Sequence, residues 1–230
     1  MVPIRRVWIT RARPGAERTA ARLAALGFTP LAFPLLSIRR LPDALVDAPP
    51  VDGASSVAFT SPNGVAAFAA LTGALRTRPA FAVGDATADA ARQAGFVDVR
   101  SAAGDIHALA ALIASTAPRG SVLAPGAREP AGDLAALLPG FPVRRLAVYA
   151  AEETGAAPPD AFDAVLLHSP RAARALSAAP PESAFGRIAV CISEAAAAPL
   201  ARLSFAEIRI AATPDEPSML TALGKPAAPV

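Results

Sequence analysis

The sequence predicts an α/β protein made of two similar domains, each a parallel sheet flanked by helices, with two connectors between them. Short apolar runs of strand type alternate with segments of helical periodicity, a pattern typical of parallel sheets with crossover helices. The run VAFTSPNGVAAF (57–68) also returns in the same layout as VLLHSPRAARAL (165–176). A repeat of this length indicates that one structural unit is used twice.

The N-terminal segment predicts one strand–helix–strand unit. A short apolar strand is expected at 7–10, and apolar residues recur at helical spacing over 16–26. The helix is expected to end at Gly27, because glycine favours the backbone conformation found just after helices. A second strand is expected at 28–33, followed by a proline-rich connector over 34–50.

The middle and last segments continue the alternation. In the middle segment we expect strands at 56–60, 80–83, 96–100, 121–124 and 143–149, with helices at 62–71, 86–94, 105–116 and 130–138. After a second connector at 150–159, we expect strands at 163–167, 187–192 and 206–210, with helices at 171–178, 195–203 and 216–223.

The repeat reaches beyond the two Ser-Pro steps. FAVGDATADAARQAGF (81–96) matches VCISEAAAAPLARLSF (190–205) at nearly the same offset, and VWIT…AARLAALGF (7–28) is similar to SVLA…AGDLAALLPGF (121–141). Two similar domains with two connectors between them account for this arrangement with the fewest assumptions.

Composition narrows the function classes. The chain has 230 residues and a mean hydropathy of +0.39, which suits folded domains with real cores. It contains 21 arginines and one lysine, but its net charge is only +3 and its aromatic residues are few. This balance argues against a nucleic-acid partner and favours an anionic small molecule, for which guanidinium groups are suited. Coding bias is the alternative explanation for the arginines.

The remaining composition excludes several kinds of site. Cys191 is the single cysteine, so no disulfide forms within the chain, and its apolar surroundings indicate an inert thiol. His107 and His168 are too few for a histidine-rich metal site. The start of the chain has no signal-peptide pattern, and Pro62 interrupts the uncharged run 53–75. We therefore expect a soluble, cytoplasmic protein without a membrane partner.

The first Ser-Pro step lies where a strand ends and a helix begins, the edge at which parallel sheets collect ligands. Ser61 suits the N-cap, and Pro62 suits the first helical position because its missing N–H would have no partner there. The free N–H groups of Asn63 and Gly64, at the positive end of the helix dipole, favour an anion.

The loop VGDATA (83–88) predicts a second helix N-terminus suited to an anion, at the end of the next strand. Gly84 allows a close backbone approach, and Thr87 lies in the first turn of the following helix. The alternative interpretation is that Ser61, Ser169 and Thr87 only cap helices.

The whole series of motifs resembles the uroporphyrinogen-III synthase family. The series is VWITRARPGAERTAARLAALGF, PLLSI, VAFTSPNGVAAF, FAVGDATADAARQAGF, AAGDIHALAALI, LAVYAAE, VLLHSPRAA and TPDEPSMLTAL. The resemblance implies two α/β domains joined by a two-stranded linker, with the substrate in the cleft between them. It further implies a discontinuous first domain (1–36 plus 152–230), an inserted second domain (37–151) and linkers near 34–42 and 147–159.

The implied reaction closes the linear tetrapyrrole hydroxymethylbilane to uroporphyrinogen III, with loss of water and inversion of ring D. It is a lyase step of haem biosynthesis that needs no metal and no organic cofactor. The substrate is rich in carboxylates, which helix N-termini and arginines bind well. We expect a monomer, with a possible transient handover of the substrate from the preceding enzyme.

The resemblance also marks site residues. Tyr149 occupies the family's tyrosine position and is the candidate proton donor to the departing hydroxyl. The candidate substrate-binding residues are Arg11, Thr60, Ser61, Asn63, Gly84, Ala86, Thr87, His168, Ser169 and Ser193.

Two loops depart from the family pattern. Residues 193–196 read Ser-Glu-Ala-Ala where Gly-x-Thr-Thr is frequent, and His168 precedes Ser169 where Thr-Ser is usual. His168 is a candidate cationic donor in place of the missing threonines. The departure at 193–196 favours one alternative, a non-catalytic homologue that binds tetrapyrroles. A second alternative is a two-domain binding protein for an anionic small molecule, in which the paired loops serve domain closure alone.

Overall fold

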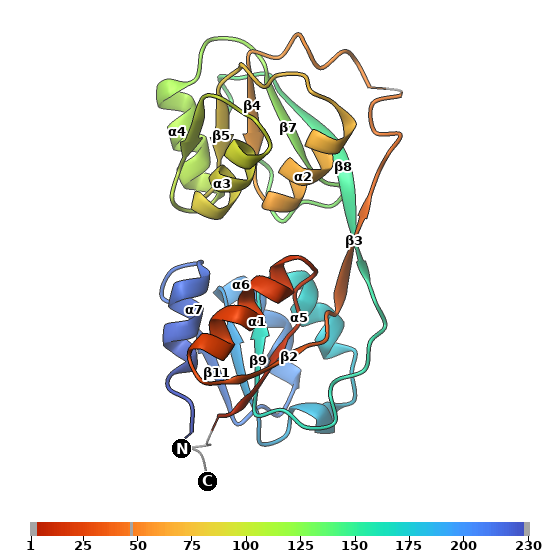
Figure 1. The fold of residues 1–230 in the computed structure, drawn as a ribbon, viewed down its shortest axis with the longest axis vertical. Coiled ribbons are helices and arrows are strands. Elements are labelled where there is room, and N and C mark those ends of the chain that lie inside the picture. The colour runs from red at the N-terminus through yellow and green to blue at the C-terminus, as the bar shows by residue number, and fades with distance from the viewer. Residues whose placement is uncertain (1–3, 47, 228–230) are drawn as a thin grey trace. The chain divides into compact units, whose positions relative to one another are not determined.

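The structure is a computed structural model that describes residues 4–46 and 48–227 (Figure 1). The chain divides into two units. Unit 1 comprises Met1–Ser37 and Glu152–Val230, and unit 2 comprises Ile38–Ala151. Each unit contains one sheet with helices on both faces, so the fold class predicted from the sequence is confirmed.

Unit 1 contains a five-stranded parallel sheet in the order β11-β10-β9-β1-β2. Its strands are β1 (Arg6–Ile9), β2 (Thr29–Ala32), β9 (Ala164–Leu167), β10 (Ile188–Cys191) and β11 (Glu207–Ile210). Its helices are α1 (Gly15–Ala25), α5 (Pro170–Ser177), α6 (Glu194–Ala197) and α7 (Glu216–Leu223), with 3₁₀ turns η1 (Pro181–Ala184) and η2 (Ala198–Arg202).

Strands β9 and β10, in the middle of the unit 1 sheet, are apolar at every position because both faces of the sheet are covered. Val7 and Ile9 of β1 pack with α1 and α7, whereas Trp8 packs on the other face with α5 and α6. This alternation is the period of two expected for a strand.

Unit 2 contains a six-stranded sheet in the order β3-β8-β7-β4-β5-β6. Its strands are β3 (Leu36–Arg40), β4 (Ser56–Phe59), β5 (Ala80–Ala82), β6 (Val99–Ser101), β7 (Val122–Ala127) and β8 (Val143–Glu153). Helices α2 (Pro62–Leu71) and α3 (Asp85–Gln93) cover one face, and α4 (Ile106–Thr116) covers the other.

The two sheets have the same topology once the chain is read in a permuted order. The order β11-β10-β9-β1-β2 of unit 1 corresponds to β6-β5-β4-β7-β8 of unit 2. Strands β9 and β4 are therefore equivalent, and each leads into a Ser-Pro step. The internal repeat predicted from the sequence is thus a repeat of structure.

The chain crosses between the units along β3 and β8, which pair in antiparallel fashion. The N–H of Leu41 donates to Val148 O at 2.9 Å, and the hydroxyl of Ser37 donates to Glu152 O at 3.4 Å. The predicted connector at 34–50 therefore contains a strand. Likewise, β8 runs to Glu153 instead of ending at 149.

The helix predicted at 130–138 is wrong. The segment consists of bends and turns, in which the carboxylate of Asp133 accepts the N–H of Ala135 at 3.0 Å. Leu134 and Leu138 are nevertheless buried against α4, as their spacing indicates. Helical spacing selected the correct buried side chains, but Pro130 and Gly132 disfavour a helix in so short a segment.

Two other predicted elements are shorter than expected. The helix predicted at 195–203 ends as α6 at Ala197 and continues as the 3₁₀ turn η2, because Pro199 has no N–H to donate. The strand predicted at 96–100 begins only at Val99. Gly95, with φ +90°, and Phe96 instead close the end of α3, where the Phe96 N–H donates to Ala91 O.

Candidate functional site at the strand ends

The two Ser-Pro steps have the geometry predicted for helix N-caps. Ser61 is extended (φ −161°, ψ 153°), and its Oγ accepts the N–H of Gly64 at 3.1 Å. Ser169 is almost identical (φ −163°, ψ 152°), and its Oγ accepts the N–H of Ala172 at 3.2 Å. Both serines are therefore helix N-caps, as predicted.

This geometry corrects one expectation about anion binding. The N–H of Gly64 is not free, because the hydroxyl of Ser61 already accepts its hydrogen bond. The N–H of Asn63 has no partner among the described residues, as expected for the second position of a helix. The first turn of α2 thus retains fewer free donors than the sequence predicts.

Glycine at position 64 allows α2 to start directly against the end of β7. A Cβ atom there would lie 3.0 Å from Pro125 O and 3.6 Å from Gly126 Cα. This close approach holds Ser61 next to β7, and β7 pairs with β8, the strand that carries Tyr149.

A bulge in the β7–β8 pairing determines to which face of the sheet the side chain of Tyr149 points. Gly126 pairs with Ala147, but the next residue, Ala127, pairs with Tyr149, so that Val148 is passed over. Tyr149 consequently shares the core cluster of Val148, on the face covered by α2 and α3. In a regular strand its side chain would point to the opposite face, toward α4.

Tyr149 and Ser61 form a hydrogen-bonded pair. Tyr149 Oη lies 3.0 Å from Ser61 Oγ, and Tyr149 is only 8% exposed. Thr60, which immediately precedes Ser61, is exposed at the same edge of the sheet. A phenol, a capping hydroxyl and an exposed hydroxyl thus gather at the end of β4 and beside the start of α2.

The second predicted loop is arranged differently. Gly84 is the N-cap of α3, and its carbonyl accepts the N–H of Thr87 at 3.0 Å. Thr87 is only 3% exposed, whereas Ala86 is exposed. The structure therefore turns Thr87 into unit 2 rather than toward the strand-end surface.

The corresponding edge of unit 1 is organised by Glu216, at the first position of α7. Its carboxylate accepts hydrogen bonds from the hydroxyl of Thr19 and from the guanidinium of Arg22. Arg11 Nη1 lies 3.4 Å from Thr19 Oγ1 and 3.8 Å from a Glu216 oxygen. The cation predicted at Arg11 is therefore already engaged by an internal carboxylate.

His168 lies against the same carboxylate without a hydrogen bond. Its side chain is 7% exposed, and its Nε2 is 3.9 Å from Glu216 Oε1, beyond hydrogen-bonding distance. Neither ring nitrogen has a hydrogen-bond partner among the described residues. Burial lowers the pKa of His168, an effect larger than the opposing influence of Glu216. A neutral imidazole follows, so the structure does not support His168 as a cationic donor.

Glu216 is strongly acidic in the folded protein. Burial by itself would raise the pKa of this carboxyl, but the hydroxyl of Thr19 and the charge of Arg11 hold it well below its usual range. The sequence analysis missed this residue. The only feature of the sequence that marks Glu216 is its place at the start of the last helix, and acidic residues are common there on solvated surfaces.

The other predicted features of unit 1 are simpler. Ser193 precedes α6 as its N-cap, but its side chain makes no capping hydrogen bond. Cys191 is buried, as predicted, and burial raises the pKa of its thiol to about 12, which disfavours the reactive thiolate.

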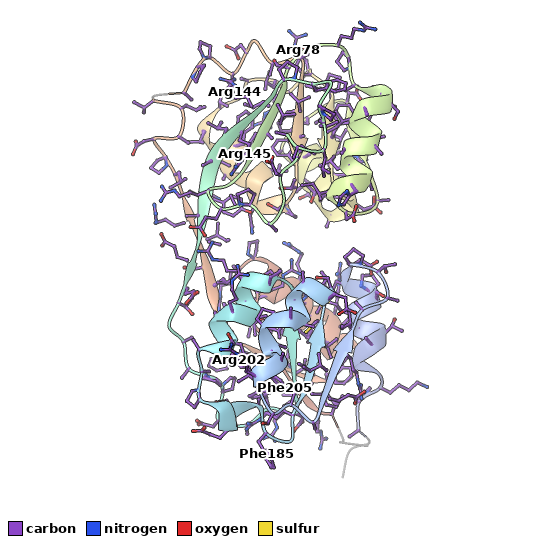
Figure 2. All side chains as sticks on the ribbon, turned by 180° about the vertical axis from the view of Figure 1, so that it is seen from behind. Arg78, Arg144, Arg145, Phe185, Arg202 and Phe205 are labelled. Atoms are coloured by element: carbon purple, nitrogen blue, oxygen red, sulfur yellow. The ribbon has the colours of Figure 1, made fainter. Side chains whose placement is uncertain are left out.

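A hollow of about 560 Å³ lies elsewhere on unit 2. It is lined in part by Arg144 and Arg145, in the first half of β8 (Figure 2). The guanidinium of Arg144 donates to Pro49 O at 2.6 Å and to Pro50 O at 3.0 Å. Arg144 is thus bound to the backbone of the same unit, and the residues that line the hollow include none of the hydroxyl groups gathered beyond the opposite end of the strands.

Comparison with known proteins identifies the family. A model of uroporphyrinogen-III synthase HemD matches residues 17–221, which is most of the chain. The chain belongs to the uroporphyrinogen-III synthase family. Its activity is accordingly the closure of hydroxymethylbilane to uroporphyrinogen III, a lyase reaction of haem biosynthesis, and the binding-protein alternatives are not favoured.

One solved structure agrees with this family in fold. A mutant uroporphyrinogen III synthase from the extremely thermophilic bacterium Thermus thermophilus is 21% identical, covers 95% of this chain and 97% of its own, and has a TM-score of 0.55. The wild-type enzyme of that bacterium in another crystal form (22% identity, 95% of each chain) and a further Thermus thermophilus structure (20%, 95% and 98%) have TM-scores of 0.43. No curated protein matches the chain significantly.

Proposed function

We propose that this synthase protonates the departing hydroxyl of ring A from Tyr149, at the strand ends of unit 2. The observation that supports this role is the placement of the tyrosine. The β-bulge turns its phenol toward the start of α2, where its Oη pairs with Ser61. A phenol is a weak acid, and a weak acid suffices for this step.

The reaction requires only a weak acid. The electron-rich pyrrole of ring A assists loss of the hydroxyl and leaves an azafulvenium cation. Ring D then attacks this cation through its already substituted carbon, giving a spiro intermediate that opens and closes again with the ring inverted. Since the linear substrate closes without inversion when unaided, the larger task of the enzyme is to hold one near-attack geometry.

Substrate binding is proposed for the strand-end residues of both units. Thr60 and Ala86 are proposed because they are exposed. Asn63 is proposed because its N–H has no partner among the described residues. The remaining proposed contacts are Arg11, Ser61, Gly84, Thr87, His168, Ser169 and Ser193. Of these, Thr87 and His168 have buried side chains, so substrate would meet their backbone.

We further propose that the functional domains are 1–36 with 152–230 and 37–151, with linkers near 34–42 and 147–159. A cytoplasmic monomer that receives its substrate by transient handover remains the expectation from the sequence. Among the helices of the described residues, none has the length and apolarity needed to cross a membrane.

The isomer ratio of the product tests the proposal. Hydroxymethylbilane is generated in situ, the protein is added, and the oxidised uroporphyrins III and I are separated by chromatography. We expect an excess of isomer III over the protein-free control, and a lower rate of its formation by Tyr149→Phe. An unchanged rate in Tyr149→Phe would remove the acid role, and isomer I alone with the unaltered protein would contradict the synthase activity.

A further inference from the structure

We propose that Ser61 is a second catalytic residue and that the hydroxyls of Ser61 and Tyr149 act as one proton-donating unit. In this unit Ser61 hands its proton to the departing hydroxyl, and Tyr149 replaces it. The inference rests on the proposed role of Tyr149, which it extends by naming the group that touches the substrate.

The hydrogen bonds made by Ser61 and Tyr149 determine which of the two hydroxyls donates to the other. Ser61 Oγ accepts one hydrogen bond from the Gly64 N–H at 3.1 Å and lies 3.0 Å from Tyr149 Oη. A single hydrogen bond joins the two hydroxyls, so one of their two protons is left without a partner among the described residues. A phenol is a stronger acid than an aliphatic alcohol, so Tyr149 donates and the proton of Ser61 remains available.

The available proton belongs to Ser61, the more exposed of the two residues. Tyr149 is 8% exposed and packs in a core cluster with Leu146 and Val148. Ser61 is partly exposed and follows Thr60, which is exposed. A substrate that approaches the strand ends therefore meets the hydroxyl of Ser61 before that of Tyr149.

The start of α2 favours this proton transfer. The Gly64 N–H withdraws electron density from Ser61 Oγ, which strengthens Ser61 as a donor in a chain of hydrogen bonds. The positive end of the helix dipole also stabilises the negative charge that the pair acquires when its proton leaves.

Comparison of the two units separates this role from capping. Ser169 has the same backbone conformation as Ser61 and caps α5 with the same kind of hydrogen bond. The chain's single tyrosine is Tyr149, so Ser169 has no phenol partner. Capping therefore accounts for a serine at both positions, but it does not account for the bulge that brings Tyr149 to one of them.

The proton balance of the step is complete. The Ser61 proton passes to the hydroxyl oxygen of ring A as the Tyr149 proton passes to Ser61 Oγ. The carbon–oxygen bond breaks with its electron pair, water leaves, and an azafulvenium cation and a phenolate remain. After ring closure, the proton released from the pyrrole returns to Tyr149 through Ser61, which restores both groups.

Kinetics of five variants test the unit: Ser61→Ala, Ser61→Thr, Tyr149→Phe, the double variant of Ser61→Ala with Tyr149→Phe, and Asp105→Ala. Asp105 caps α4 in the same unit through its carboxylate, so its loss controls for the removal of a cap. We expect Ser61→Ala and Tyr149→Phe each to lower kcat for isomer III by about 100-fold. The double variant should be no slower than either single one, because the groups act in series. Asp105→Ala should keep its kcat, and Ser61→Thr, which retains a hydroxyl, should regain most of the activity.

Raman spectroscopy gives a readout that does not depend on activity. Because the chain has one tyrosine, its Raman doublet reports Tyr149 alone. We expect a donor-type intensity ratio in the unaltered protein, lost in Ser61→Ala and kept in Asp105→Ala. An acceptor-type ratio in the unaltered protein would overturn the direction of the pair.

The kinetic outcomes distinguish this inference from the function on which it rests. A normal kcat in Ser61→Ala beside a slow Tyr149→Phe would overturn the relay and leave Tyr149 as the acid. Effects that multiply in the double variant would show two independent groups and also overturn the relay. A normal Tyr149→Phe would instead remove the proposed acid, and the relay with it.

Discussion

Glu216→Gln removes the negative charge that organises the strand ends of unit 1. The carboxylate contacts Thr19, Arg22 and Arg11, and its side chain is 11% exposed. Glutamine has the same size, so the substitution tests the charge rather than the packing. We expect the variant to fold and to be less stable at neutral pH.

The size of the effect follows from the pKa of Glu216. Contacts in the folded protein lower this pKa from 4.5 to about 2, against the opposing effect of burial. One pKa unit corresponds to about 1.4 kcal/mol, so the charged form contributes at most about 3.4 kcal/mol to the free energy of unfolding. A lowered pKa gives stability that is complete above pH 4.5 and disappears as the pH falls toward 2. The difference between the proteins should therefore shrink over this range.

Urea unfolding followed by tryptophan fluorescence measures this difference in the correct unit. Trp8 is the only tryptophan of the chain and is fully buried in unit 1. Unfolding is measured for both proteins at pH 7, 5 and 3. That bound is reduced by solvent screening, so we expect a loss of about 1 to 2 kcal/mol in the variant at pH 7, and a clearly smaller loss at pH 3.

Glu17→Gln is the matched control. Glu17 also pairs with an arginine, Arg13, at 3.0 Å, but its side chain is 48% exposed. Exposed ion pairs add little to stability, so this variant should unfold like the unaltered protein at each pH. A loss below about 1 kcal/mol for Glu216→Gln at pH 7, or one that stays constant down to pH 3, would refute the reasoning.

Three other predictions concern two buried side chains and one glycine with a positive φ. Because burial lowers the pKa of His168 below 6.5, stability should fall as the pH drops below 6.5, and urea unfolding at pH 7.5 and 5.5 should show a smaller fall in His168→Asn. Cys191 should resist a thiol reagent at pH 8 until urea unfolds unit 1, and rapid labelling of the folded protein would contradict its burial. Gly120 has φ +135°, and a Cβ there would lie 2.0 Å from Ser55 Oγ. Gly120→Ala should thus cost about 1 to 3 kcal/mol, whereas Gly140→Ala, with nothing within 4 Å, should show no such clash.

The candidate site was predictable where it depends on neighbours in the chain. An apolar run followed by Ser-Pro predicts a strand end and a capped helix, and Ser61 and Ser169 have this geometry. Capping is local, because the hydroxyl reaches a backbone N–H three residues further along. The internal repeat likewise predicts two similar sheets.

The candidate site was not predictable where it joins residues distant in the chain. Glu216 meets Arg11 because β1 and α7 lie at one end of the same unit, and nothing in either segment indicates the partner. Tyr149 meets Ser61 because a bulge adds one residue to β8 and turns the side chain to the other face.

The sequence by itself determined the α/β alternation, the duplicated unit and the buried faces of its elements, since these depend on periodicities of two and 3.6 residues. Even the segment 130–138, wrongly predicted as a helix, has its leucines in the core. Only the tertiary structure decided which strand ends meet, how β7 and β8 are paired, and which carboxylate neutralises Arg11. Such contacts depend on strand register and close packing, which periodicity within one segment does not specify.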